Sequence, residues 1–121
     1  MLPERTPLAL NLSTLQLQGA SLRVDVTDAE SRLLQCLIAA PGNRMDGEAL
    51  LSKLDLPADT AGKNALGVRV VRLRKKLLAA GAGEPTIKSI RNGGYQLCVP
   101  VVAQRSSGQV QPLSPTNDSR P

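Results

Sequence analysis

The sequence predicts an α+β domain in which an N-terminal antiparallel sheet is followed by three helices and a C-terminal β-hairpin. Three observations support this prediction. Within residues 8–26, two segments alternate between apolar and polar side chains, as half-buried strands do. Residues 27–80 carry apolar side chains at helical spacing, interrupted at Pro41-Gly42. Residues 86–99 form two short strand patterns around Asn92-Gly93, a signal for a tight type I′ turn.

The predicted N-terminal sheet is a small meander with one buried face. Residues 8–11 are apolar, residues 14–18 alternate strictly, and residues 21–26 alternate again after a turn at Gly19-Ala20. Every second side chain of a strand lies on the same face. We therefore expect five side chains to point inward: Leu15, Leu17, Leu22, Val24 and Val26.

Two helices are expected after the meander. Thr27 and Glu30 have the spacing of a capping box, and Pro41-Gly42 stops the first helix at Ala40. Asp46 is the expected N-cap of the second helix. The apolar stripes of these helices are Leu33, Leu34, Leu37 and Ile38, and then Leu50, Leu51 and Leu54.

The third helix is expected from Lys63 to Ala80, after a loop over residues 56–62. Gly67 lies inside it and costs about 1 kcal/mol relative to alanine. The core-facing stripe is Leu66, Val70, Leu73 and Leu77. The opposite side is expected to carry Val68, Arg69, Arg72 and Lys76.

Positive charge is concentrated in residues 63–91. This segment has eight Lys or Arg and one acid, Glu84, which gives it a net charge of +7, whereas the whole chain carries +5. A basic helix that leads into a basic hairpin predicts a winged helix-turn-helix. In that fold the helix enters the major groove of duplex DNA and the hairpin wing reaches the minor groove. The alternative is a solvated basic helix without a partner.

Other function classes lack the residues that they need. The chain has no histidine, and its carboxylates are scattered or lie at helix starts, so we expect no enzyme, no metal site and no cofactor. No segment approaches the ~20 apolar residues that span a membrane, and no secretory signal pattern is present. We therefore expect a cytoplasmic protein, with Cys36 and Cys98 as buried thiols in a reducing compartment.

The chain is expected to form one domain with two tails. Phe and Trp are absent and Tyr95 is the only aromatic residue, so the core must be aliphatic. We expect an N-terminal arm over residues 1–7 and the domain over residues 8–102. Residues 103–121 are rich in Pro, Ser and Gln, and this composition predicts a disordered tail.

The order of the elements and four motifs resemble the C-terminal effector domain of OmpR/PhoB-type response regulators, over about residues 8–99. The motifs are Val26-Thr-Asp-Ala-Glu30 with Leu33-Leu34, Ala40-Pro-Gly42, Arg72-Leu-Arg-Lys-Lys-Leu77, and Ser89-Ile-Arg-Asn-Gly-Gly-Tyr-Gln-Leu97. The resemblance implies a bacterial two-component transcription regulator that binds double-stranded DNA. It also implies a dimer on direct repeats and RNA polymerase as a partner.

By this resemblance the third helix is the recognition helix. Its groove-facing positions would be Asn64, Gly67, Val68, Arg69, Val71 and Arg72, and Arg74 would meet phosphate. In the wing, Ser89 and Arg91 would contact the DNA backbone and the minor groove. The basic helix adds Lys63 and Lys76 as candidates, and the hairpin tip adds Asn92. Arginine suits both grooves, because it can bind guanine through two hydrogen bonds or occupy a narrow minor groove.

Several positions depart from the family pattern. Ser31 replaces an aromatic residue, Leu54 replaces a tryptophan, and Gly47 replaces a basic residue at the start of the second helix. Val71 replaces one of two paired arginines, and Gly67 replaces an acidic residue. Because fewer polar groups face the groove, we expect altered specificity and lower affinity.

Family members usually carry a receiver domain before this module, whereas seven residues precede the first predicted strand here. The chain is a fragment or a stand-alone regulator, and its start and tail favour the stand-alone protein. A competing function is a winged-helix interaction adaptor with weak or no DNA binding. An RNA-binding or nucleoid protein is disfavoured because aromatic stacking residues are nearly absent.

Overall fold

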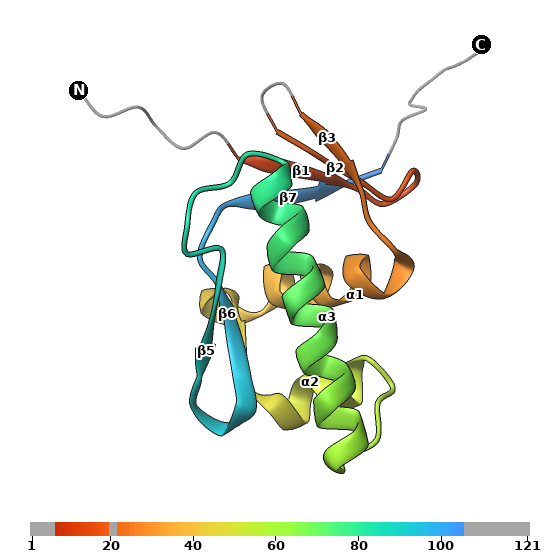
Figure 1. Ribbon diagram of the computed structural model, residues 1–121, viewed down its shortest axis with the longest axis vertical. Helices are drawn as coiled ribbons and strands as arrows, with labels where there is room; N and C mark the ends of the chain where they lie inside the picture. The colour runs from red at the N-terminus through yellow and green to blue at the C-terminus, as the bar shows by residue number, and fades with distance from the viewer. Residues whose placement is uncertain (1–6, 20–21, 106–121) are drawn as a thin grey trace.

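The computed structural model describes residues 7–19 and 22–105 of the chain. Most of the predicted N-terminal arm and tail therefore lie outside the described residues. The strands are β1 (Leu8–Asn11), β2 (Gln16–Gln18), β3 (Arg23–Asp25), β4 (Arg44–Met45), β5 (Ile87–Ile90), β6 (Gly94–Leu97) and β7 (Val101–Gln104). The helices are α1 (Asp28–Ala39), α2 (Gly47–Lys53) and α3 (Thr60–Ala79). Figure 1 shows α3 running from α2 past α1 to the N-terminal sheet, with the β5–β6 hairpin beside it.

The N-terminal sheet has four strands in the order β3-β2-β1-β7. The β1–β2 and β2–β3 pairs are antiparallel, as predicted, but β7 pairs parallel to β1. The prediction that the tail begins at Ala103 is wrong in this respect. Ala103 and Gln104 belong to β7 and pair with Leu10 and Asn11. The strand satisfies the backbone groups of β1, which would otherwise form an open sheet edge.

The buried face of this sheet is smaller than the alternation predicts. Leu17 is fully buried, but Leu15 is only half-buried and takes a left-handed φ of 56° just before β2 begins. Val24 is half-buried as well, and Val26 is buried. The prediction for Leu22 is wrong, because it precedes β3 and is 51% exposed.

The predicted helix caps are present. The Thr27 Oγ1 accepts a hydrogen bond from the Glu30 N–H at 3.1 Å, and a Glu30 carboxylate oxygen accepts from the Thr27 N–H at 2.9 Å. Asp46 caps α2 by accepting from the Ala49 N–H at 2.8 Å. The third helix begins three residues earlier than predicted, because Asp59 accepts from the Gly62 N–H at 2.9 Å and so caps its first turn.

The core is aliphatic, as predicted. The stripe of α3 packs inward at full length, and the leucines of α1 and α2 meet it. The residues at most 4% exposed include Leu33, Leu34, Leu37, Leu50, Leu51, Leu54, Leu66, Val70, Leu73 and Leu77. The two cysteines are free and half-buried rather than fully buried, and burial raises the pKa of the Cys36 thiol.

Candidate nucleic-acid interface

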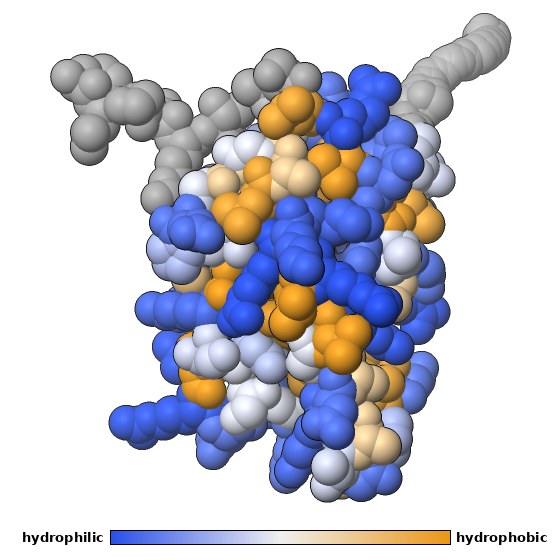
Figure 2. Space-filling model, viewed as in Figure 1, coloured by the Kyte–Doolittle hydropathy of each residue, from blue (hydrophilic) through white to orange (hydrophobic). Residues whose placement is uncertain are grey.

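One face of α3 is free of the core and carries most of the predicted groove-facing residues. It lies opposite the buried stripe and contains no acidic residue, since α3 has none. Gly67 is half-buried on its edge, and a Cβ added there would meet no heavy atom within 4 Å. The exposed residues of this face include Asn64, Val68, Val71, Arg72 and Lys75. Figure 2 shows hydrophobic side chains along the middle of α3, bordered by hydrophilic ones.

The side of α3 that faces the hairpin carries Lys63 and Arg74. Arg74 is half-buried, and its Nε donates a hydrogen bond to the Ile87 carbonyl of β5 at 2.9 Å. This bond ties the hairpin to the helix across 13 residues of sequence. Arg74 is thus partly engaged within the fold, whereas its sequence position indicated only a phosphate contact.

The other side of α3 carries Arg69 and Lys76. Lys76 does not share the free face, contrary to the prediction. Its ammonium donates to the Asp25 carbonyl at 2.7 Å and pairs with a Glu30 carboxylate oxygen at 3.1 Å. Arg69 is half-buried. The physical reason for the correction is that the buried carboxylate of Glu30 requires a cation, and Lys76 is within reach.

The pKa of Glu30 reflects this arrangement. Burial alone raises the pKa of the carboxyl, because its side chain is only 4% exposed. The hydrogen bond from the Thr27 backbone and then the interaction with Lys76 outweigh burial, so that the pKa is below its ordinary value. Glu30 therefore stays ionised and joins the start of α1 to the last turns of α3.

The hairpin of β5 and β6 forms the predicted wing. Ile90 pairs with Gly94, so that three residues form its tip: Arg91, Asn92 and Gly93. Both Asn92 and Gly93 take positive φ, of 61° and 68°, as the turn signal predicts, but the loop is one residue longer than a two-residue turn. All three tip residues are exposed, as are Lys88 and Ser89 on β5.

The backbone of the wing lies in close contact with the start of α2 at two buried glycines. A Cβ added to Gly47 would lie 2.7 Å from the Asn92 carbonyl oxygen and 2.8 Å from that of Gly93. One added to Gly94 would lie 2.6 Å from the Asp46 Cα. Real Cβ atoms do not approach backbone this closely, so only glycine permits the contact. Sequence reasoning missed this role because it treated Gly47 only as the loss of a cation.

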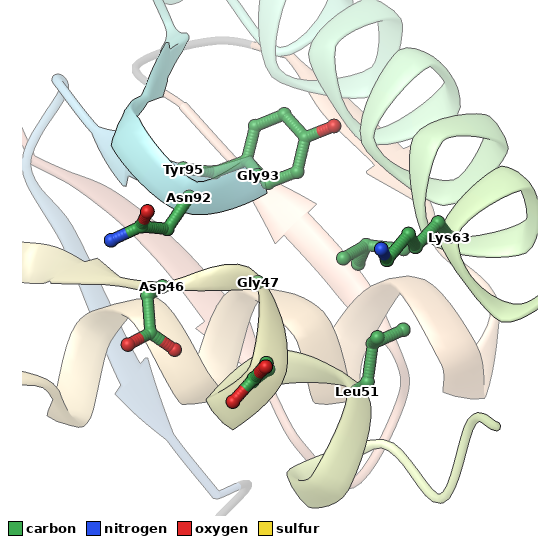
Figure 3. Close-up of a pocket in the computed structure, with 9 residues that line it drawn as sticks. Asp46, Gly47, Leu51, Lys63, Asn92, Gly93 and Tyr95 are labelled. Carbon is green, nitrogen blue, oxygen red and sulfur yellow. The ribbon is translucent and has the colours of Figure 1, made fainter. Parts of the chain in front are cut away.

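A cleft of about 590 Å³ lies between the wing tip, α2 and the start of α3. Figure 3 shows Tyr95 extending from β6 toward α3, with Lys63 on the α3 wall and Asp46 beside the start of α2. Glu48 and Leu51 complete the α2 side. The cleft thus separates the free face of α3 from the wing tip and carries carboxylates on one wall and an ammonium on the other.

Two other kinds of site are not found within residues 7–19 and 22–105. No group of three or more His, Cys, Asp or Glu side chains is arranged to hold a metal ion. None of the helices in this part of the chain is both long and apolar enough to cross a membrane.

These features define the class of protein: three helices, a protruding hairpin and a basic free face on the third helix make a winged helix-turn-helix domain. The family described as "Transcriptional regulatory protein, C terminal" matches residues 21–97. The chain therefore belongs to this OmpR/PhoB-type family, as the motifs predicted.

The curated relatives that match are longer than this chain. The chain is 31% identical over 105 residues to the protein RcaC of Microchaete diplosiphon, which covers 87% of this chain and 16% of RcaC. It is 29% identical over 100 residues to the cell cycle response regulator CtrA of Brucella abortus, covering 83% of this chain and 43% of CtrA. The chain thus spans less than half the length of these relatives.

Solved structures support the same fold. The RstA DNA-binding domain of Klebsiella pneumoniae, in complex with the RstA box, aligns with a TM-score of 0.61 at 29% identity, over 78% of this chain and 94% of that domain. The C-terminal domain of the nisin resistance regulator NsrR, a lantibiotic response regulator, also gives 0.61 at 29% identity, over 78% and 93% of the two chains. The AdeR DNA-binding domain, at 19% identity and a TM-score of 0.62, shows the fold alone.

Proposed function

We propose that this chain is a sequence-specific double-stranded-DNA-binding transcription regulator. The observation that carries the proposal is the exposed, acid-free face of α3 beside the exposed wing tip, in a chain of this family. In the proposed complex α3 enters the major groove and Arg91 enters the adjacent minor groove. The RstA domain, whose structure is a complex with the RstA box, supports this proposal.

A salt titration tests the proposal. Six Lys or Arg side chains of α3 and the wing, all exposed or half-buried, are candidates for phosphate or base contacts: Lys63, Arg69, Arg72, Lys75, Lys88 and Arg91. If about six phosphates are neutralised, affinity for duplex DNA should fall about 10³-fold between 50 and 200 mM salt. Absence of measurable binding to any duplex at about 50 mM salt would reject the proposal.

Two variants separate base reading from phosphate binding. Arg72→Ala should weaken the specific complex more than the non-specific one, because a base contact of this kind contributes about 1–3 kcal/mol. Arg91→Ala should lower affinity most for sites with A·T-rich flanks, where a narrow minor groove attracts cations most strongly. Arg91→Lys should recover part of that loss. If Arg91→Ala lowered the affinity equally for A·T-rich and G·C-rich flanks, Arg91 would contact only phosphate and would not read the width of the minor groove.

A second candidate is a winged-helix adaptor that binds protein rather than DNA. The observation that favours it is the apolar middle of the free face, where Val68 and Val71 are each 47% exposed. An adaptor would bind non-specific duplex barely at all, so the same salt titration distinguishes the two candidates.

The leading proposal has three further parts. We propose that the chain binds direct repeats as a dimer, that it contacts RNA polymerase, and that it is located in the cytoplasm. Sedimentation of the complex on one and two half-sites tests the dimer.

A further inference from the structure

The free face of α3 has an apolar ridge where a purely electrostatic DNA-binding helix would be polar. Val68 and Val71 are among the few exposed large hydrophobic residues of the described chain, and they lie one turn apart on the same face. Gly67 beside them presents no side chain, and the space around it is open. Arg72 and Lys75 border the ridge and are exposed.

We infer that Val68 and Val71 recognise the C5-methyl groups of thymine in the major groove. The inference rests on the proposed function and adds the base chemistry that the helix selects. Among the groups at the edges of the major groove, the thymine methyl is the one that apolar side chains recognise. The flanking cations argue for DNA rather than for an apolar protein surface, since methyl groups in the groove lie between two rows of phosphates.

The spacing of the two valines fits neighbouring base pairs. Side chains one turn apart on a helix have Cβ atoms about 5–6 Å apart. Bases of one strand are stacked about 3.4 Å apart along the axis. The pair therefore spans one to two base steps, and we expect one or two thymines within a single half-site to be read.

Selection from a random duplex pool, followed by removal of single methyl groups, tests the inference. Replacing one thymine by deoxyuridine deletes its C5-methyl and leaves base pairing and the phosphates unchanged. At the one or two positions read by the valines, the affinity of the wild-type chain should fall about fourfold per methyl, the value of one buried CH₂-sized group. Substitution at other thymines of the same site should leave the affinity unchanged.

Three variants complete the experiment. In Val68→Ala and Val71→Ala the fourfold difference between thymine and deoxyuridine should disappear at the corresponding position. Val102→Ala, which truncates a valine 51% exposed on β7, is the matched control and should keep the wild-type profile. Retention of the difference in both α3 variants would overturn the inference, as would a wild-type affinity that no deoxyuridine lowers.

The failure of the inference is distinguishable from failure of the proposed function. If the wild-type chain enriches a site that is insensitive to deoxyuridine, the chain binds specific DNA but the valines do not read methyl groups. If no sequence is enriched at all, the proposed function fails and the thymine reading fails with it. The valine ridge would then be a protein-binding surface.

Discussion

Replacing Gly47 by alanine tests how rigidly the wing is held against α2. Gly47 is the first residue of α2, and its φ is not in the left-handed region, so the backbone conformation itself accepts alanine. Helix propensity predicts a gain in stability of at most about 1 kcal/mol, and less at a helix end than in the interior. The added Cβ, however, would lie 2.7 Å from the Asn92 carbonyl oxygen.

The magnitude follows from that contact. To restore an ordinary separation of 3.4 Å, the wing tip must withdraw by about 0.7 Å, and its partner is backbone rather than a flexible side chain. Overpacking of this kind costs about 1–3 kcal/mol, which exceeds the gain in propensity. We therefore expect Gly47→Ala to lower the free energy of unfolding by about 1–2 kcal/mol. For a domain of this size the Tm should fall by about 5–10 °C.

Thermal melts followed by circular dichroism measure the effect, with Gly67→Ala as the matched control. Gly67 lies inside α3 with no heavy atom within 4 Å of an added Cβ, so the same chemical change should stabilise the domain there by about 1 kcal/mol. The two substitutions should thus shift the Tm in opposite directions. If Gly47→Ala melted at or above the wild type, the wing would be free to move and the close approach would not constrain it.

Three further predictions concern the core, the buried ion pair and the last strand. Leu73→Ala should cost about 2–5 kcal/mol, because Leu73 is fully buried, and an unshifted denaturation midpoint would mean that α3 packs through another face. Because the folded-state pKa of Glu30 is lowered, its contribution to stability is present above pH ~4.3 and is lost as the pH falls through the folded-state value. Glu30→Gln should therefore be less stable near pH 7 but lose less stability between about pH 5 and about pH 3, and a wild-type slope there would contradict the network. A chain ended at Val102 should melt below one ended at Arg105, since only the former loses two residues of β7, and equal melting would show that this end of the strand contributes nothing.

Local signals predicted the helices and the core well. The caps at Thr27 and Asp46 were predicted from residues three positions apart. A cap depends only on residues of the adjacent helical turn, so the local sequence is enough to predict it. The α3 stripe could be read in the same way, because a period of 3.6 identifies the buried face without any knowledge of its partner. The start of α3 was missed because Gly62 in its first turn lowers helix propensity, although Asp59 caps it.

Several features that the sequence did not predict depend on residues far apart in the chain. The strand β7 pairs with β1 across some ninety positions, and its residues have the composition of a tail after Val102. Lys76 looked like one more cation on the free face, because its partner Glu30 is 46 residues away. The candidate site was therefore predicted as a set of residues on α3 and the wing. Which of their charges are already engaged within the fold depends on tertiary contacts.

Gly47 connects the loss of a cation with the position of the wing. The family resemblance places a basic side chain at this position, but the contact between α2 and the wing tip leaves no room even for a methyl group. A lysine here would have to displace the wing tip. The glycine at this position therefore has two effects at once: it removes the cation that the resemblance places there, and it allows the wing tip to contact α2 closely. Lys76 bound to Glu30 and Arg74 bound to the Ile87 carbonyl are two further cations that are engaged within the fold. The apolar ridge on α3 then has to supply more of the discrimination between sites. Specific binding by this chain should accordingly depend less on salt than binding by a relative with cations at these positions, because apolar contacts release no counterions.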